Sequence, residues 1–247
     1  MEAGTLVLLR HGESEGNARE IFTGLIDVDL TSGGVAETRR AAARLVAAGL
    51  HPAVWVISPM LRALRTAQVL AEQLPPPEQL VVDGRLVERN YGALSGMSKT
   101  AVRQRWGAEQ FRSWRRTLDG TPPPLEPERL QQMAEPLLGA PHLALTPTEN
   151  LRQVIARVGD AWQHGIRPLL AAGQDVLVVA HGNSLRALCA VLDQLDPTEV
   201  EELNLPNAHP LVYHFDADWR PLPRGGSYLD PVSAAIAARV IASQGGT

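Results

Sequence analysis

Two histidines of this chain share one local setting, in which each follows a short apolar run and precedes a glycine. The run at residues 5–9 leads through Arg10 into His11. The run at residues 175–180 leads directly into His181, 170 positions beyond His11. A glycine lets backbone or a bulky ligand approach closely. A single histidine at a strand end is usually an ordinary polar residue, but the repeated pattern indicates that these two imidazoles serve one site.

The residues around the two histidines suit a phosphate ligand. Arg10 and Arg62, which follows a third apolar run, carry guanidinium groups that match phosphate oxygens in pairs. Ser14 and Asn183 can donate further hydrogen bonds, and backbone N–H groups at a helix start after His11 would favour an anion. These residue types therefore indicate an anion site built for phosphate.

Two imidazoles and several arginines can together transfer a phosphoryl group. A neutral imidazole among cationic donors is a nucleophile toward phosphorus. Its other ring nitrogen must donate to a partner such as a backbone carbonyl, because that bond fixes the tautomer. A second, protonated imidazole would stabilise charge on the group in transit. We therefore predict phosphoryl transfer through a phosphohistidine, with no obligatory metal.

The three apolar runs show no alternation, which predicts strands buried on both faces of a parallel sheet with crossover helices. Ligands bind outside the carboxyl ends of such strands, where the polar turns of all three runs lie. We expect a three-layer α/β/α fold, a mostly parallel central sheet with helices on both faces. The strands are expected at residues 5–9, 53–57 and 175–180, and the helices at 34–48, 61–74, 151–170 and 185–195.

The rest of the sequence contains no linker between two cores, so we expect a single domain over residues 1–247. Residues 118–147 contain seven prolines and predict a long loop or lid. The alternating stretch 211–215 predicts a strand. A C-terminal tail is expected over about 224–247, with an Ala-rich helix at 233–243.

Composition excludes several classes of protein. The 23 Lys and Arg against 27 Asp and Glu leave a net charge of −4, so no global positive field attracts nucleic acid or an anionic membrane. The single Cys189 excludes an internal disulfide framework and a cysteine-based metal site. The early apolar run is too short for a membrane span and has the wrong flanks for a secretion signal. We expect a cytoplasmic protein with small-molecule partners, bound neither to nucleic acid nor to a membrane.

The motifs around these residues resemble those of the histidine phosphatase superfamily. Residues 9–13 (LRHGE) with Asn17 are similar to its first signature, residues 58–67 to its second, and residues 181–182 with Arg186 to its third. Within the superfamily, the chain is similar to the cofactor-dependent phosphoglycerate mutases over nearly its full length. The similar segments are residues 22–24, 27–30, 88–89, 91–94, 99, 114–116, 181–188 and 210–213.

The resemblance implies a role for each matching residue. His11 would be the phosphorylated nucleophile, Glu88 the proton donor and acceptor for the substrate hydroxyl, and His181 a stabiliser of the transition state. The residues that would bind the phosphoryl group, the substrate carboxylate and a second phosphate are Arg10, Ser14, Asn17, Thr23, Gly24, Arg62, Arg89, Asn90, Tyr91, Lys99, Arg115, Arg116, Gly182 and Asn183.

The resemblance also implies a reaction, the interconversion of 3-phosphoglycerate and 2-phosphoglycerate in glycolysis and gluconeogenesis through a 2,3-bisphosphoglycerate intermediate. The implied cofactor is 2,3-bisphosphoglycerate, which primes His11, and no metal is implied. Dimers and tetramers are common in the family, so a homodimer and a homotetramer are both compatible with the sequence.

The chain departs from the family pattern at four places outside the core chemistry. Asn90 replaces a usual histidine, and Leu61 replaces a frequent lysine before Arg62. Three prolines at 122–124 replace a charged stretch of the long loop, and the tail is Ala-rich where the family has a basic one. These differences concern the lid, the retention of the cofactor and the subunit contacts.

Two other functions are compatible with the same motifs. In a phosphatase of this fold, water rather than a sugar-acid hydroxyl accepts the phosphoryl group. In a non-catalytic sensor of a phosphorylated ligand, His11 or Glu88 would be lost, and both are present. Lys99, Arg115 and Arg116 favour the mutase, because a bisphosphate with a carboxylate needs more cations than a monophosphate does.

Overall fold

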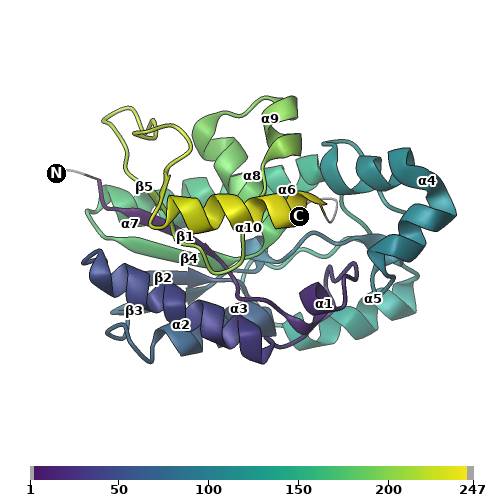
Figure 1. The fold of residues 1–247 in the computed structure, drawn as a ribbon, viewed down its shortest axis with the longest axis horizontal. Coiled ribbons are helices and arrows are strands. Elements are labelled where there is room, and N and C mark those ends of the chain that lie inside the picture. Colours follow the sequence, from purple (N-terminus) through teal and green to yellow (C-terminus); the bar gives the residue numbers. More distant parts are fainter. Residues whose placement is uncertain (1–2, 244–247) are drawn as a thin grey trace.

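A central sheet of six strands lies between two layers of helices in the computed structural model, which describes residues 3–243 (Figure 1). The strand order is β3-β2-β4-β1-β5-β6; the first four strands are parallel, and β5 and β6 join antiparallel at one edge. The strands are β1 (Leu6–Arg10), β2 (Val54–Ile57), β3 (Gln79–Val82), β4 (Val176–Ala180), β5 (Leu211–Tyr213) and β6 (Ser227–Tyr228).

The helices cover both faces of this sheet, as Figure 1 shows for α2 and α3 on one side and α6, α8 and α9 on the other. Successive residues of β1 alternate between two apolar cores: Leu6 and Leu8 pack with α6 and α8, and Val7 and Leu9 pack with α2 and α3. This arrangement confirms the expected three-layer α/β/α fold. The helices are α1 (Glu15–Ala18), α2 (Ser32–Ala47), α3 (Leu61–Leu70), α4 (Lys99–Arg116), α5 (Pro127–Ala134), α6 (Leu151–Ala161), α7 (Arg167–Ala171), α8 (Gly182–Asp193), α9 (Pro197–Glu202) and α10 (Pro231–Ser243).

The register of the parallel strands brings their carboxyl ends together. Arg10 of β1 pairs with Ala180 of β4, and Ile57 of β2 pairs with Val179. The residues that follow these pairs therefore start from one edge of the sheet. The three strands predicted from apolar runs are present, with bounds within one residue of those expected.

Two segments differ from their predictions for local reasons. The helix expected over 151–170 is interrupted by a π-helical turn, Trp162–Ile166, shortly before Pro168, which has no N–H to donate to the helical ladder. The proline-rich segment 118–147 is partly ordered, because α5 and the 3₁₀ turn Glu135–Leu137 pack Leu137 against Val87. Two short 3₁₀ turns, Gly84–Leu86 and Gly92–Leu94, flank residues 87–91.

Two strands and the position of the tail were not predicted. β3 and β6 are short strands at the two edges of the sheet, where side chains are exposed or only partly buried, so neither shows the five- or six-residue apolar run that marks the buried strands. The predicted C-terminal helix is present as α10, which begins two residues earlier than expected. Within the described residues, no helix combines the length and the apolar character that crossing a bilayer would require.

Candidate active site

The ends of β1 and β4 bring the two histidine rings into contact. His11 follows β1 and His181 follows β4, and their ring centroids are 5.1 Å apart with planes tilted by 58°. Both side chains are almost fully buried. The His11 N–H donates to the Ala180 carbonyl at 3.0 Å, so the parallel ladder continues one residue past β1 and fixes the backbone at the ring.

The His11 ring is held as a neutral nucleophile. Its Nδ1 lies 2.7 Å from the Gly12 carbonyl oxygen, and because a carbonyl can only accept, Nδ1 carries the hydrogen and Nε2 carries the lone pair. Burial, reinforced by the charges of Arg62 and Arg10, lowers the pKa of His11 well below its ordinary value. The ring is therefore neutral at neutral pH, with a hydrogen on Nδ1 and a free lone pair on Nε2 for attack on phosphorus.

The His181 ring is positioned by a serine that sequence analysis did not assign to the site. His181 Nε2 lies 2.7 Å from Ser58 Oγ, while the buried Nδ1 has no hydrogen-bond partner among the described residues. Ser58 follows β2 at the same sheet edge. Residues directly after the carboxyl ends of parallel strands gather at one site, and this applies to Ser58 as it does to the two histidines.

The charge state of His181 depends on the groups that surround it. Burial, then the charge of Arg62, lowers the pKa of His181 well below its ordinary value, so the ring is neutral among the protein's own groups. A dianionic phosphoryl group between the rings would oppose that shift, because an opposite charge favours the protonated form. Protonation of His181 is thus tied to the arrival of the phosphoryl group.

Two buried arginines supply fixed positive charge beside the rings. Arg62 donates from Nη1 to the Ile26 carbonyl at 3.0 Å and from Nη2 to the Gly24 carbonyl at 3.1 Å. Arg10 donates from Nη1 to the Leu205 carbonyl at 2.8 Å, and its buried Nε has no hydrogen-bond partner within the described residues. Burial lowers the pKa of each guanidinium to about 10, which leaves both cationic at neutral pH.

Glu88 is held close to the start of α8. Its Oε1 accepts from the backbone N–H of Arg89 at 2.6 Å, and both of its carboxylate oxygens lie 3.3–3.4 Å from the backbone nitrogen of Asn183. Asn183 in turn donates to the Tyr91 hydroxyl at 3.0 Å and accepts from Arg186 at 2.6 Å. The carboxylate is nearly buried, and backbone donors fix its position as a proton-exchanging group requires.

A cavity of about 280 Å³ opens beside these groups. It is lined by nine residues of the predicted site: Arg10, Asn17, Thr23, Gly24, Glu88, Tyr91, Lys99, Arg115 and Asn183. It is also lined by residues that sequence analysis did not assign to the site: Glu13, Ile21, Phe22, Glu37, Asn207, His209, Ala237, Val240 and Ile241.

Helix α4 brings two cations to the cavity. Lys99 begins the helix and Arg115 lies near its end, and the helix bends at Gly107, where φ is 82°. The Arg115 guanidinium stacks 5.3 Å from the ring centroid of Phe22. Burial, then the charges of Arg115 and Arg10, lowers the pKa of Lys99 to about 7.

Eight predicted site residues do not belong to the cavity lining: His11, His181 and Arg62, which are buried beside it, and five others. Ser14 caps α1, and Gly182 begins α8. Arg89 donates to the backbone carbonyls of Glu149 and Gly120, and Asn90 donates to the carbonyl of Thr146. Arg116 contacts α9 through the Glu201 carbonyl and borders a second hollow. The substrate-binding roles of these residues stay predictions.

Helix α10 covers the cavity with apolar side chains. Ala237, Val240 and Ile241 line it, where the family pattern has a basic tail. The start of the helix is fixed by an ion pair between Asp230 and Arg44 at 2.7 Å and by a hydrogen bond between Ser233 Oγ and His209 Nε2 at 3.0 Å. The alanine-rich tail therefore places apolar side chains at the edge of the cavity.

Residues 3–243 contain no cluster of three or more His, Cys, Asp or Glu side chains arranged to hold a metal ion. The cations of the cavity, by contrast, suit a ligand with several negative charges. The unpartnered buried Nε of Arg10, the amine of Lys99 and the positive charge of Arg115 suit a bisphosphate with a carboxylate. The residues present thus fit a phosphorylated cofactor.

Comparison with known proteins agrees with this geometry. The model of the histidine phosphatase superfamily (branch 1) matches residues 6–140 and 125–222. The chain is 44% identical to the 2,3-bisphosphoglycerate-dependent phosphoglycerate mutases of Clavibacter sepedonicus, over 99% of this chain and 98% of that protein, and of Rhodococcus jostii (strain RHA1), over 100% and 98%.

Solved structures share the fold at lower identity. Bacillus stearothermophilus YhfR superposes with a TM-score of 0.65 at 24% identity, over 92% of this chain and 94% of that chain. The likeness to YhfR concerns the fold alone, whereas the full-length identity to the curated relatives defines the family. The chain belongs to the histidine phosphatase superfamily (branch 1), in the family of the 2,3-bisphosphoglycerate-dependent phosphoglycerate mutases.

Proposed function

We propose that this chain is a 2,3-bisphosphoglycerate-dependent phosphoglycerate mutase that interconverts 3-phosphoglycerate and 2-phosphoglycerate through a phosphohistidine at His11. The observation that carries the proposal is the pair of rings 5.1 Å apart, with the His11 tautomer fixed by the Gly12 carbonyl. The names of relatives 44% identical over nearly the full chain support the substrate class.

Proton exchange in this reaction falls to Glu88. When the substrate hydroxyl attacks phospho-His11, an O–P bond forms, the P–Nε2 bond breaks, and its electron pair returns to Nε2. The hydroxyl proton passes to the Glu88 carboxylate, and in the reverse transfer Glu88 returns a proton to the leaving oxygen. The backbone N–H groups that hold this carboxylate keep it in one position through both transfers.

The cationic groups stabilise the phosphoryl group in transit, whose charge spreads over three oxygens. Arg10 and Arg62 are fixed by backbone carbonyls before the reaction begins, so little reorganisation is needed when charge develops. His181 adds a donor on the side opposite Ser58. These residues perform the electrostatic part of catalysis with the chain's own groups.

Lys99, Arg115, Arg10 and Tyr91 would hold the cofactor, because all four line the cavity. When bound, 2,3-bisphosphoglycerate supplies the phosphoryl group that loads His11. The cations that line the cavity argue for the mutase over the phosphatase of the same fold, because a ligand with two phosphates and a carboxylate needs more positive groups than a monophosphate does.

A coupled assay tests the proposed function directly. The purified protein should convert 3-phosphoglycerate to 2-phosphoglycerate in the presence of EDTA, and a trace of 2,3-bisphosphoglycerate should raise the rate. Release of inorganic phosphate should be much slower than isomerisation. Phosphate release without isomerisation would instead assign the phosphatase, and a requirement for added metal would contradict the phosphohistidine route.

Binding of phosphoglycerate should depend on pH through Lys99. The pKa of Lys99 is about 7, so above pH 7 the free protein holds a neutral amine, and a bound anion restores the proton. Substrate affinity should therefore fall by up to about tenfold per pH unit above pH 7, where the phosphate, with its second pKa of roughly 6, is already fully ionised.

Calorimetry in buffers of different ionisation enthalpy measures this proton uptake at pH 8. The Lys99→Arg variant keeps its charge over the same range and should bind with a much shallower pH dependence. Equal proton uptake by the two proteins would exclude Lys99 as the titrating group.

Three further expectations stay predictions: the single domain over residues 1–247, the cytoplasmic location, and a homodimer or homotetramer. Sedimentation of the purified protein distinguishes the two assemblies from a monomer.

A further inference from the structure

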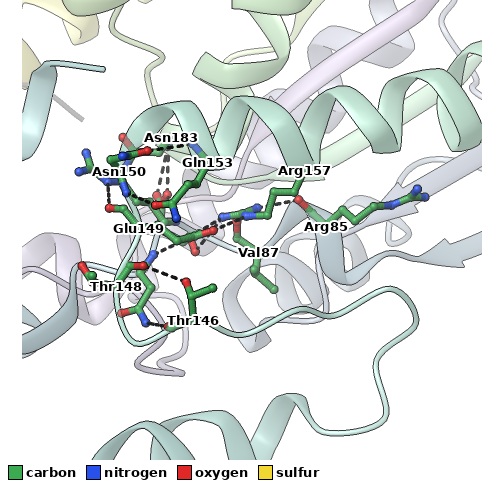
Figure 2. Close-up of polar contacts among 12 residues, drawn as sticks. Arg85, Val87, Thr146, Thr148, Glu149, Asn150, Gln153, Arg157 and Asn183 are labelled. Carbon is green, nitrogen blue, oxygen red and sulfur yellow. Dashed lines mark hydrogen bonds and ion pairs between the residues drawn. The ribbon is translucent and has the colours of Figure 1, made fainter. Parts of the chain in front are cut away.

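A nearly buried ion pair lies beneath the segment that carries Glu88. Arg157 of α6 donates from Nε to Glu149 Oε1 at 2.7 Å and from Nη2 to Glu149 Oε2 at 3.0 Å. The side chains are 13% and 9% exposed. We call these two residues the Glu149–Arg157 clamp, and Figure 2 shows their side chains meeting.

The arginine of the clamp contacts three backbone carbonyls, two before Glu88 and that of Glu88 itself. Arg157 Nη1 donates to the carbonyls of Arg85 at 2.6 Å and Val87 at 2.9 Å, contacts visible in Figure 2. Its Nη2 lies 3.4 Å from the carbonyl oxygen of Glu88 itself. One planar guanidinium thus ties this backbone to α6.

The glutamate of the clamp holds the backbone on the other side of Glu88. Its Oε2 accepts from the backbone N–H of Asn90 at 2.9 Å, and its own N–H donates to the Asn90 carbonyl at 2.9 Å. Its carbonyl accepts from Arg89 Nε at 2.9 Å. The clamp therefore contacts the backbone on both sides of Glu88. Its hydrogen bonds to this segment go to backbone atoms and not to the Glu88 carboxylate.

The charge state of the clamp is secure. Burial opposes the ionised carboxylate of Glu149, but the charge and hydrogen bonds of Arg157, with the N–H of Asn90, outweigh burial and lower the pKa of Glu149. The pair is charged at neutral pH, and it gains the extra hydrogen bonds that a buried ion pair needs to offset its desolvation.

The position of the Glu88 carboxylate depends on this backbone. Its Oε1 accepts from the N–H of the next residue, Arg89, and its second backbone donor, Asn183, belongs to α8. A shift of residues 87–90 relative to α8 would therefore change the place of the carboxylate in the cavity. A misplacement of about 1 Å can reduce catalysis by as much as 10²-fold.

We propose that Glu149 and Arg157 are positioning residues for Glu88, which act by holding the backbone of residues 85–90 against α6 so that the Glu88 carboxylate meets the oxygen of the transferring group. This inference rests on the proposed function of Glu88 as the proton donor and acceptor. The structure assigns the clamp no contact with the cavity, since neither residue lines it.

The test compares two phosphoryl donors in Glu149→Gln, a variant that keeps the shape of the side chain and removes its charge. Transfer to His11 from an alkyl phosphate such as a phosphoglycerate needs a proton donor, because the leaving alkoxide is strongly basic. Transfer from 4-nitrophenyl phosphate does not, because nitrophenolate is a weak base. We expect kcat for phosphoglycerate to fall by about tenfold or more with KM nearly unchanged, while labelling of His11 by 4-nitrophenyl phosphate stays within about twofold of wild type.

Arg157→Lys is the second variant, because it keeps the charge but cannot span the carboxylate and three carbonyls. Tyr213→Phe is the control, since it removes a buried hydrogen bond of 2.7 Å between β5 and Asp193, at the end of α8 far from Asn183 in the sequence. Melting temperatures are compared for all three proteins. Tyr213→Phe should be destabilised without the contrast between donors.

An equal loss with both donors, or no loss with either, in the two clamp variants would overturn the proposal. The proposed function has a separate readout, because wild-type protein that fails to isomerise phosphoglycerate contradicts the mutase itself. Glycerol 3-phosphate then takes the place of phosphoglycerate as the alkyl donor, and the contrast between donors still decides whether the clamp positions Glu88.

Discussion

The His11→Ala variant should show no acid-labile phosphoenzyme and should lose roughly four orders of magnitude or more in turnover. The reason is that no other side chain among residues 3–243 combines a neutral ring, a tautomer fixed by a backbone carbonyl and two neighbouring arginine charges. His181 is the nearest candidate, but its Nε2 is engaged with Ser58 at 2.7 Å. The measurement is labelling with radioactive 2,3-bisphosphoglycerate, followed by acid treatment and a coupled assay of turnover.

His51→Ala is the matched control, because His51 is exposed on the surface and does not line the cavity. It should label and turn over like the wild type. Acid-labile label that persists in His11→Ala at wild-type stoichiometry would exclude His11 as the nucleophile, and Ser58 and His181 would then need to be reassigned. Unchanged thermal unfolding of the variant ensures that the loss is chemical.

The Glu88→Gln variant should lower kcat for the interconversion of phosphoglycerates by about 10²- to 10⁴-fold, with a much smaller change in KM. The amide can still accept from the N–H groups of Arg89 and Asn183, so its position is kept and only its ability to exchange a proton is lost. Steady-state kinetics in both directions measures the effect.

Labelling of His11 by 4-nitrophenyl phosphate should survive in Glu88→Gln, for the reason given for the clamp. Glu72→Gln, which changes an exposed carboxylate paired with Arg39, should leave turnover unchanged. If Glu88→Gln loses less than a factor of ten, proton exchange must be assigned to another cavity carboxylate, of which Glu13 and Glu37 are the available ones.

The sheet and the two rings were predictable because they follow from short-range pattern and one topological rule. Apolar runs without alternation define buried parallel strands, and the carboxyl ends of such strands gather ligands. Arg10 pairs with Ala180 at the carboxyl ends of β1 and β4, so the histidine that follows each residue starts from the same edge of the sheet. Consistent use of that rule would also have selected Ser58, which follows β2 in the same way.

The supporting contacts were not predictable from pattern. Glu149 and Arg157 contact residues 85–90 through hydrogen bonds between residues about 60 to 72 positions apart in the sequence. No periodic pattern in either segment predicts these hydrogen bonds. Arg89 and Asn90 could be matched to a family motif, yet their side chains donate to backbone carbonyls. A motif identifies residue types, whereas the direction of a buried side chain depends on the acceptors that the fold brings near.

The C-terminal helix illustrates the same division. Its existence over 233–243 was readable from an alanine-rich composition, because alanine favours helix. Its place beside the cavity depends on contacts between distant residues: the ion pair of Asp230 with Arg44 and the hydrogen bond between Ser233 and His209. The sequence could therefore show that the basic tail was missing but not that apolar side chains stand in its place.

The pairing of β1 with β4 and β5 has a consequence for biosynthesis. The first strand to leave the ribosome has no neighbour in the sheet until residues 176–180 and 211–213 have followed it. His11 is thus synthesised early, but the site around it forms only after β4 and β5 have been synthesised. Contacts between residues so far apart in the sequence form slowly during folding. A nascent or truncated product that stops before residue 176 would hold His11 without its partner ring, and would be inert toward cellular phosphate esters.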